Sequence, residues 1–251
     1  MKTIKLISLA LLLTLVASLY SEETLAGTYT TNFSLTENPI SEGGNWVGGQ
    51  TAGNNLWGNI QTNGTMAYGV SQPTSYGDPT AILTGSWGPD QTAQATIKIN
   101  TTPRNCCYEA EVRLRTTINP TNHTITGYEV YCSVASNEPY CHIASWGGPN
   151  GVWVNMESGG PHTYLRNGDI LKATVTGTNP VTIKAYLNGT QIMSVQDTGN
   201  FTFSDGKKYG PWTTGNPGIG FYGGQWSYFG ISNFTASDGG LSAPENLRIV
   251  P

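Results

Sequence analysis

The strand pattern of residues 170–197 decides the fold class; they read ILKATVTGTNPVTIKAYLNGTQIMSVQD. This stretch predicts strands over Ile170–Thr176, Val181–Leu187 and Ile192–Asp197, separated by turn residues. The second and third strands are joined through Asn188-Gly189, and Asn-Gly takes the positive φ angles that a type I′ hairpin turn requires. We therefore predict consecutive antiparallel strands with a tight turn.

The same pattern continues in both directions along the chain, whereas helical periodicity is scarce. Further strands are predicted over Gly27–Phe33, Leu56–Ile60, Thr65–Tyr68, Ala81–Leu83, Ala93–Ile99, Tyr108–Thr116, Gly127–Val134, Tyr140–Trp146, Val152–Glu157, Gly218–Tyr222 and Tyr228–Ala236. Their spacing, with turns about every 8 to 12 residues, is typical of a two-sheet sandwich.

The composition excludes several classes of protein. Charged residues make up 11% of the chain, against about 25% in an average soluble domain. The formal net charge of −4 gives no basic surface for a phosphate backbone, so we expect no nucleic-acid partner. With 7 Trp, 13 Tyr and 6 Phe, the chain is neither a coiled coil nor a helical bundle, and it is too rich in aromatic residues for a disordered segment.

The two ends of the chain differ from its middle. Lys2 and Lys5 precede an apolar run over Leu6–Tyr20, and small residues follow it, which is the pattern of a secretory signal peptide over residues 1–26. The run is shorter than the roughly 20 residues of a membrane span, although an uncleaved anchor stays an alternative. We expect one domain over residues 27–240, a linker or tail over residues 241–251, and a secreted monomer with no membrane span.

The four cysteines fit an oxidising compartment. If the chain folds back at the turn over residues 135–139, Cys132 and Cys141 lie opposite each other, which predicts a disulfide between them. The adjacent Cys106 and Cys107 leave three alternatives open: a vicinal disulfide, bonds to other cysteines, or free thiols. A zinc site is a competing interpretation, but neither pair has the CxxC spacing.

Alternation along three strands predicts a polar sheet face. Glu109, Glu111, Arg113 and Arg115 share one side of their strand, opposite the apolar Ala110, Val112 and Leu114. In the next hairpin, Tyr131 is expected opposite His142. Together with the third strand and one loop tip, this face gives the candidate glycan-binding residues Glu111, Arg113, Glu129, Tyr131, His142, Trp146, Trp153, Asn155 and Trp226. The alternative is a solvated face with cross-strand ion pairs, such as Arg113 with Glu129.

Three stretches resemble the concanavalin A-like lectin/glucanase superfamily, in its laminin-G-like bacterial form. They are residues 38–46 (NPISEGGNW), residues 88–97 (GPDQTAQATI), and a third made of residues 167–173 (NGDILKA), 186–189 (YLNG), 215–221 (GNPGIGF) and 229–236 (FGISNFTA). The resemblance implies an all-β fold, a two-sheet antiparallel jelly-roll sandwich that binds sugars on a concave sheet face. It specifies a fold better than a function, because the superfamily includes lectins, hydrolases, lyases and adhesion domains.

Three functions follow as expectations. The first is a secreted polysaccharide-binding module that recognises a glycan without covalent chemistry. The second is an enzyme on the same face: resemblance to alginate lyases gives His142 as base or carboxylate partner, Tyr131 as acid, and Arg113 or Arg115 as neutraliser. A glycoside hydrolase would instead need two carboxyl groups, for which Glu109 and Glu111 are about 7 Å apart by strand geometry. The third function is a structural or adhesion domain.

The resemblance also implies a structural calcium ion that joins the first and last strands. Asn32, Glu42 and Asp238 lie in the appropriate parts of the chain to contribute oxygen ligands.

Overall fold

The computed structural model describes residues 27–49, 57–70, 77–102, 107–119, 121–157, 160, 162–223 and 226–239. The predicted signal peptide over residues 1–26 and the predicted tail over residues 241–251 lie outside these ranges. The described part of the chain contains no helix with the length and apolar character that a membrane span needs.

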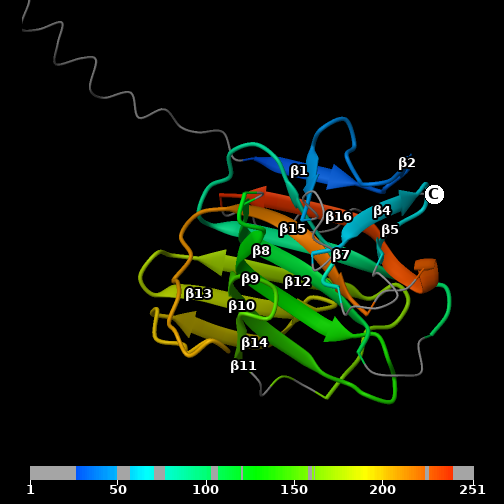
Figure 1. The fold of residues 1–251 in the computed structure, drawn as a ribbon. Helices are drawn as coiled ribbons and strands as arrows, with labels where there is room; N and C mark the ends of the chain where they lie inside the picture. The colour runs from blue at the N-terminus through cyan, green and yellow to red at the C-terminus, as the bar shows by residue number, and fades with distance from the viewer. Residues whose placement is uncertain are drawn as a thin grey trace, which may run out of the picture.

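Two antiparallel sheets form the molecule (Figure 1). The nine-stranded sheet runs in the order β14 (Thr190–Asp197), β13 (Val181–Leu187), β12 (Ile170–Thr176), β7 (Gln91–Ile99), β16 (Phe229–Asp238), β5 (Ala67–Val70), β4 (Asn59–Asn63) and β2 (Thr36–Glu37), with β1 (Thr28–Thr31) paired to β16. The seven-stranded sheet runs β11 (Trp153–Glu157), β10 (Cys141–Gly148), β9 (Thr124–Ser133), β8 (Glu109–Asn119), β15 (Asn216–Tyr222), β6 (Thr80–Leu83) and β3 (Trp46–Gly48). A 3-10 turn, η1 (Trp226–Tyr228), precedes β16.

These sheets confirm the predicted all-β, two-sheet antiparallel sandwich. The strands predicted over Ile170–Thr176 and Val181–Leu187 have the predicted bounds as β12 and β13. The turn after β13 has φ angles of 50° at Asn188 and 82° at Gly189, as a type I′ turn requires. The short strands β2 and β3 were not predicted, because two or three residues are too few to show alternation.

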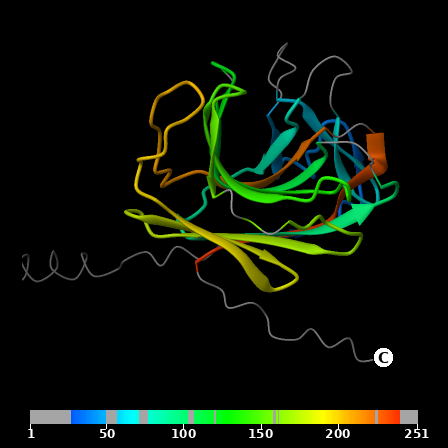
Figure 2. The same ribbon diagram turned by 90° about the horizontal axis from the view of Figure 1, so that it is seen from below.

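The core lies between the two sheets. Ala93, Ala95 and Ile97 of β7 point inward, and so do the predicted inward residues of β8, which include Val112 and Leu114; all are buried in one cluster. Figure 2 shows the green strands of the seven-stranded sheet bent into a curve whose hollow side faces away from the other sheet. The residues of this hollow side therefore face outward, and they carry the candidate site.

Candidate functional site

The hairpin formed by β9 and β10 has the predicted register. Cys132 pairs with Cys141 and Tyr131 pairs with His142. A disulfide joins Cys132 to Cys141, which confirms the predicted bond. Cys107 is also disulfide-bonded, so it is not a free thiol or a zinc ligand, while Cys106 lies outside the described residues.

The outward face of β8 meets the outward faces of its neighbours on both sides. Glu111 lies opposite Tyr131 and Arg113 lies opposite Glu129 across the β8–β9 pair. One strand further, the register between β10 and β11 places Trp153 beside Trp146. The predicted polar face therefore belongs to a single sheet.

Arg113 is the centre of a buried ionic cluster on this face. Its Nη2 atom lies 2.7 Å from Asp78 Oδ1, 2.7 Å from Glu111 Oε2 and 2.8 Å from Glu129 Oε2. The Nε1 atom of Trp146 donates a hydrogen bond of 2.5 Å to Glu129 Oε2. The expected ion pair of Arg113 with Glu129 is thus present, but it is part of a cluster from which solvent is largely excluded.

Strand β15 makes room for this cluster. Its Gly220 pairs with Glu111 of β8 on one side and with Thr80 of β6 on the other. A Cβ atom at Gly220 would lie 2.0 Å from Glu111 Oε2 and 2.7 Å from Arg113 Nε. Because glycine leaves this position empty, Arg113 reaches across β15 to Asp78, which lies just before β6.

The cluster holds more carboxyl groups than cations, and the pKa values of these carboxyl groups are raised. Burial raises the pKa of Asp78 to about 8, and burial likewise raises the pKa of the nearby Glu109 to about 8. Burial and the charge of Glu129 raise the pKa of Glu111 well above its ordinary value, and burial raises that of Glu129. Burial opposes the charge of Arg113, but the carboxylates around it raise its pKa. These buried acids therefore hold their protons more strongly than exposed carboxyl groups do.

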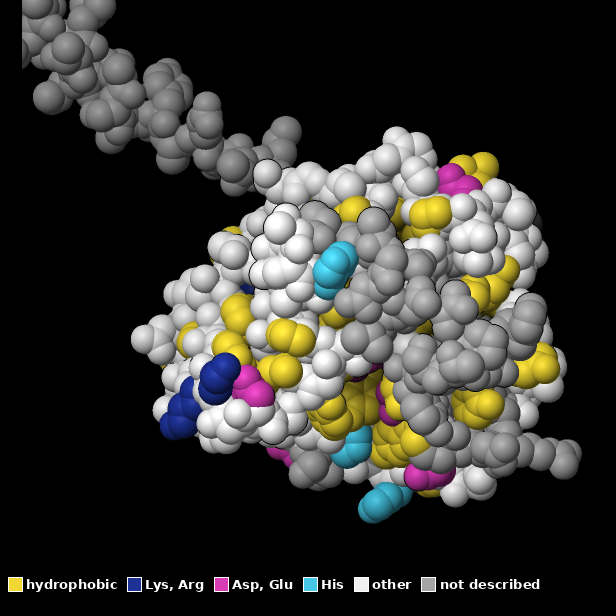
Figure 3. Space-filling model, viewed as in Figure 1, with side chains coloured by type: hydrophobic (Ala, Val, Ile, Leu, Met, Phe, Trp, Pro, Cys, Tyr) yellow, Lys and Arg dark blue, Asp and Glu magenta, His cyan; other side chains and the backbone are white. Residues whose placement is uncertain are grey.

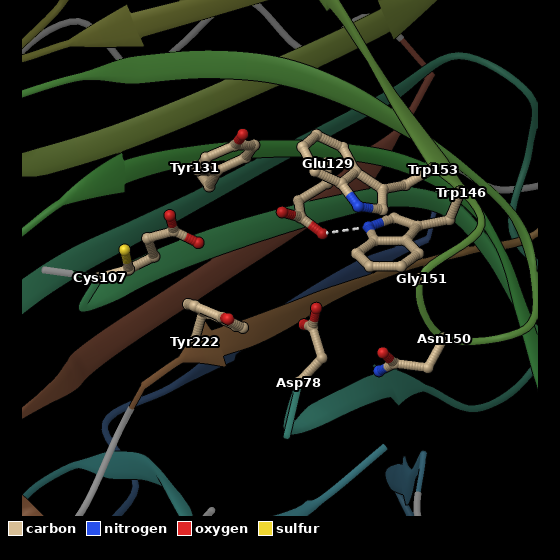
Figure 4. Close-up of a pocket in the computed structure, with 10 residues that line it drawn as sticks. Asp78, Cys107, Glu129, Tyr131, Trp146, Asn150, Gly151, Trp153 and Tyr222 are labelled. Atoms are coloured by element: carbon tan, nitrogen blue, oxygen red, sulfur yellow. Dashed lines mark hydrogen bonds between the residues drawn. The ribbon is translucent and has the colours of Figure 1, made fainter. Parts of the chain in front are cut away.

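A pocket of about 310 Å³ opens above the cluster. In the space-filling view, the hollow below the centre of the molecule has yellow hydrophobic side chains along it and magenta acidic groups between them (Figure 3). The described residues that line the pocket are Asp78, Cys107, Glu109, Glu129, Tyr131, Trp146, Asn150, Gly151, Trp153 and Tyr222. Figure 4 shows the carboxylates of Glu129 and Asp78 pointing toward the space that these side chains surround.

Four of the predicted glycan-binding residues line this pocket: Glu129, Tyr131, Trp146 and Trp153. Asn155 is not among the described residues that line the pocket, but its Oδ1 atom accepts a 2.8 Å hydrogen bond from the hydroxyl of Tyr131, which does line it. Both Glu111 and Arg113 lie beneath the pocket, each 1% exposed, so a ligand reaches neither of them directly.

His142 is beside the pocket rather than in it. Its ring stacks on Tyr140 with 5.5 Å between centroids, and it lies 5.3 Å from the ring of Tyr131. Burial lowers its pKa, which favours the neutral imidazole. The residues proposed for a lyase, His142, Tyr131 and Arg113, therefore do not converge on one open space.

Arg115 leaves the polar face altogether, which corrects the predicted alternation at this end of β8. The register of β8 with β9 shifts between Leu114 and Thr117, and Arg115 has a φ of 47°. Its guanidinium donates to the backbone carbonyls of Pro89, Trp212 and Gly177 at 2.6–2.8 Å. Arg115 is thus a buried structural group and is not available to neutralise a substrate.

Several residues of the pocket were not predicted as site residues from the sequence. Tyr222 has the outward position opposite Glu109, but its strand was not expected to adjoin β8. Asp78 lies outside any strand, and Asn150 and Gly151 belong to the turn between β10 and β11, so alternation indicates none of them. Trp226, predicted at a loop tip, begins η1, and its side chain lies outside what the structure describes.

The residues expected to bind calcium do not form a common ligand set. Glu42 accepts hydrogen bonds from Thr31 Oγ1 at 2.5 Å, from Trp46 Nε1 at 2.8 Å and from the Tyr29 hydroxyl. Asp238 accepts hydrogen bonds from the backbone N–H groups of Gly27 and Gly88. Both carboxylates are thus satisfied by separate protein donors and Asn32 is exposed, so these residues do not fit the implied ion.

Another acidic group has the spacing of a metal site. One oxygen from each of Asp78, Glu111 and Glu129 lies within 4.8 Å of the others. Nη2 of Arg113 already contacts all three side chains at 2.7–2.8 Å. The guanidinium group of Arg113 therefore occupies the position that a metal ion would need. We assign no chemical step to a metal.

Comparison with known proteins gives distant structural matches and no sequence match. No protein-family model matches the chain, and no curated protein sequence matches it. Among solved structures, the carbohydrate recognition domain of Emp46p is 10% identical with a TM-score of 0.49, covering 84% of this chain and 96% of that one. The β-agarase A of Zobellia galactanivorans is 11% identical with a TM-score of 0.49, covering 85% and 93%. The β-porphyranase BpGH16B of Bacteroides plebeius is 9% identical with a TM-score of 0.45, covering 91% and 98%.

The TM-scores of these matches lie below 0.5, so the all-β, two-sheet architecture of this chain rests on its own strand pairing. Likeness at such low identity concerns the fold alone, so the function has to be argued from the pocket.

Proposed function

We propose that the pocket on the hollow side of the seven-stranded sheet binds a carbohydrate without covalent chemistry. The observation that carries the proposal is that four aromatic side chains and three carboxyl groups line a single cavity of about 310 Å³. This volume is near the lower end of the range of about 300–1,000 Å³ found for ligand sites, which fits one sugar unit or a chain end.

The lining supplies both kinds of contact that a sugar needs. The rings of Trp146 and Trp153 lie 6.2 Å apart at an interplanar angle of 37°, and they offer apolar surface to the C–H face of a pyranose. The carboxyl groups of Glu109, Glu129 and Asp78 offer hydrogen-bond partners to its hydroxyls. Trp153 is 36% exposed at the edge of the pocket, so a ligand can reach its ring.

The test is binding to a panel of soluble oligosaccharides, measured by isothermal titration calorimetry. Replacing Trp153 with alanine is expected to weaken binding about tenfold or more, because a central aromatic contact contributes at least about 1.4 kcal/mol. The matched control is Tyr186→Ala on the outer face of the nine-stranded sheet, which should bind as the unchanged protein does. If no glycan in the panel binds, or if the two variants behave alike, the proposal fails.

Glycoside hydrolysis is the second candidate, and one observation favours it. Asp78 and Glu129 both line the pocket, and oxygens of the two carboxyl groups lie within 4.8 Å of each other. Retaining hydrolases use a pair about 5–5.5 Å apart, one protonated as the general acid and one ionised as the nucleophile. The pKa of Asp78 is raised to about 8 by burial, which suits the acid role, and Glu129 would be the nucleophile.

This candidate is tested by release of reducing ends from polysaccharides. Asp78→Asn would be expected to lower the rate by at least about 100-fold, the size of a general-acid contribution, and Glu129→Gln by at least as much, because it removes the nucleophile. If the unchanged protein is active and either variant keeps that activity, Asp78 and Glu129 are excluded as the catalytic pair. A lyase has less support, because the cation it needs for a uronate carboxylate, Arg113, is already shared by three carboxyl groups.

We also propose that the chain is exported and acts as a monomer over residues 27–240. The disulfide between Cys132 and Cys141 supports an oxidising compartment. Mass spectrometry of the secreted protein would test export through the new amino terminus near residue 26. A mature chain that still begins at Met1 would contradict it.

A further inference from the structure

We infer that the pocket prefers a sugar that carries a free amino group to a neutral or an acidic sugar. The inference rests on the proposed carbohydrate binding and names the class of carbohydrate. It follows from the charges of the lining, from the state of the ionic cluster beneath it, and from the aromatic walls.

The lining is acidic and offers no cation. Asp78, Glu109 and Glu129 contribute carboxyl groups, and none of the ten described residues that line the pocket is a lysine, an arginine or a histidine. An ammonium group entering the pocket would meet carboxyl groups with which it can form charge-assisted hydrogen bonds. A uronate carboxylate would meet only groups that repel it or that must hold a proton beside it.

The cation beneath the pocket is buried and already paired with acids. Arg113 uses one nitrogen for Asp78, Glu111 and Glu129, so one positive charge serves three acids. Among the described residues, Oε1 of Glu111 and Nε of Arg113 are both buried and have no hydrogen-bond partner. With three carboxyl groups and one cation, the cluster therefore has acceptor capacity that the protein itself does not satisfy.

The aromatic side chains of the pocket also favour a positively charged ligand. The face of an aromatic ring carries negative electrostatic potential and attracts a cation that lies over it. The guanidinium carbon of Arg113 already lies 5.7 Å from the ring centroids of Trp57 and Trp146. Three further rings besides that of Trp146 line the cavity, those of Trp153, Tyr131 and Tyr222. Carboxyl groups and ring faces together form a lining suited to an organic ammonium ion.

The proton affinities of the lining agree with this argument. Burial raises the pKa of Asp78 and that of Glu109 to about 8, and repulsion among the acids adds to both shifts. A bound ammonium group would relieve that repulsion and let the carboxyl groups ionise.

The test compares three oligosaccharides of equal length by isothermal titration calorimetry at about pH 6, where an amino group is protonated. They are a glucosamine hexamer, its N-acetylated counterpart and a galacturonate hexamer. The glucosamine hexamer is expected to bind at least about tenfold more tightly than the N-acetylated one, and the galacturonate hexamer more weakly than both. Equal or weaker binding of the glucosamine hexamer overturns the inference but leaves carbohydrate binding intact. No binding of any oligosaccharide, including neutral glucans, defeats the proposed function instead.

A second measurement uses Glu109→Gln, which removes one carboxyl group that a bound ammonium ion could ionise, at nearly constant shape. The ratio of the two affinities, glucosamine to N-acetylglucosamine, should fall by about threefold or more. Glu138→Gln, at the exposed turn between β9 and β10, is the matched control and should keep the ratio. Far-ultraviolet circular dichroism establishes that both variants are folded. An unchanged ratio in folded Glu109→Gln would contradict the role given to the lining charges.

Discussion

At the scale of single residues, Arg113 determines whether the site exists. Its guanidinium group is 1% exposed and neutralises part of a cluster of three carboxyl groups that are themselves buried. Taking these groups out of water is costly, and only mutual attraction and hydrogen bonds offset that cost. The cluster thus gives the pocket its acidic floor and makes that floor depend on one side chain.

Arg113→Met should therefore destabilise the fold by about 3–5 kcal/mol at neutral pH, because it leaves buried carboxyl groups without their cation. The loss should be smaller at about pH 5, since the acids can then be neutral in the folded state. Urea unfolding at the two pH values measures both effects. Arg166→Met, at an exposed position, is the control and should change stability little. Equal losses in the two variants would mean that the cluster does not stabilise the fold.

At the scale of elements, β15 brings together what the sequence keeps apart. It pairs with β8 and with β6, and Gly220 leaves a gap between them on the hollow side of the sheet. Side chains from β8 and from the segment before β6 meet through this gap. The site is therefore a property of strand order, with a glycine where two strands have to share space.

Gly220→Ala is expected to destabilise the protein by about 1–3 kcal/mol, because the new methyl group would overlap the carboxylate of Glu111. Gly48→Ala in β3 is a matched control: its Cβ would lie 3.6 Å from Asn59 Oδ1, an ordinary contact. Thermal unfolding of both variants measures the difference. If Gly220→Ala is as stable as Gly48→Ala, the close packing at β15 is not required.

The sequence predicts the local part of this arrangement and not the rest. The hairpin of β9 and β10 follows from its turn, so its register, its disulfide and the pairing of Tyr131 with His142 could all be derived. Alternation fails at Arg115, because a bulge adds residues to one strand and redirects the side chain. Asp78 could not be assigned, because its position depends on a strand order that no local pattern specifies.

At the scale of the whole molecule, the buried acids should set how stability depends on pH. The pKa values of Asp78 and Glu109 are about 8 in the folded protein, and those of Glu111 and Glu129 are also raised. Unfolded carboxyl groups titrate near pH 4. Between these values the folded state binds more protons than the unfolded state, so the free energy of unfolding falls as pH rises. This dependence has the opposite sign to that of a protein whose carboxylates form exposed salt bridges.

We predict that stability decreases between about pH 7 and pH 8, by up to about 1.4 kcal/mol per pH unit for each carboxyl group that is protonated only in the folded state. His142 opposes this trend at lower pH, because its lowered pKa makes the unfolded state bind the extra proton below about pH 6.5. Urea unfolding across this range gives the slope. Glu109→Gln should reduce the slope, since glutamine does not titrate, whereas the exposed Glu138→Gln should leave it unchanged. A stability that is constant or increases from pH 7 to pH 8 would show that the acids are ionised in the folded protein, and the protonated acid required for hydrolysis would then be missing.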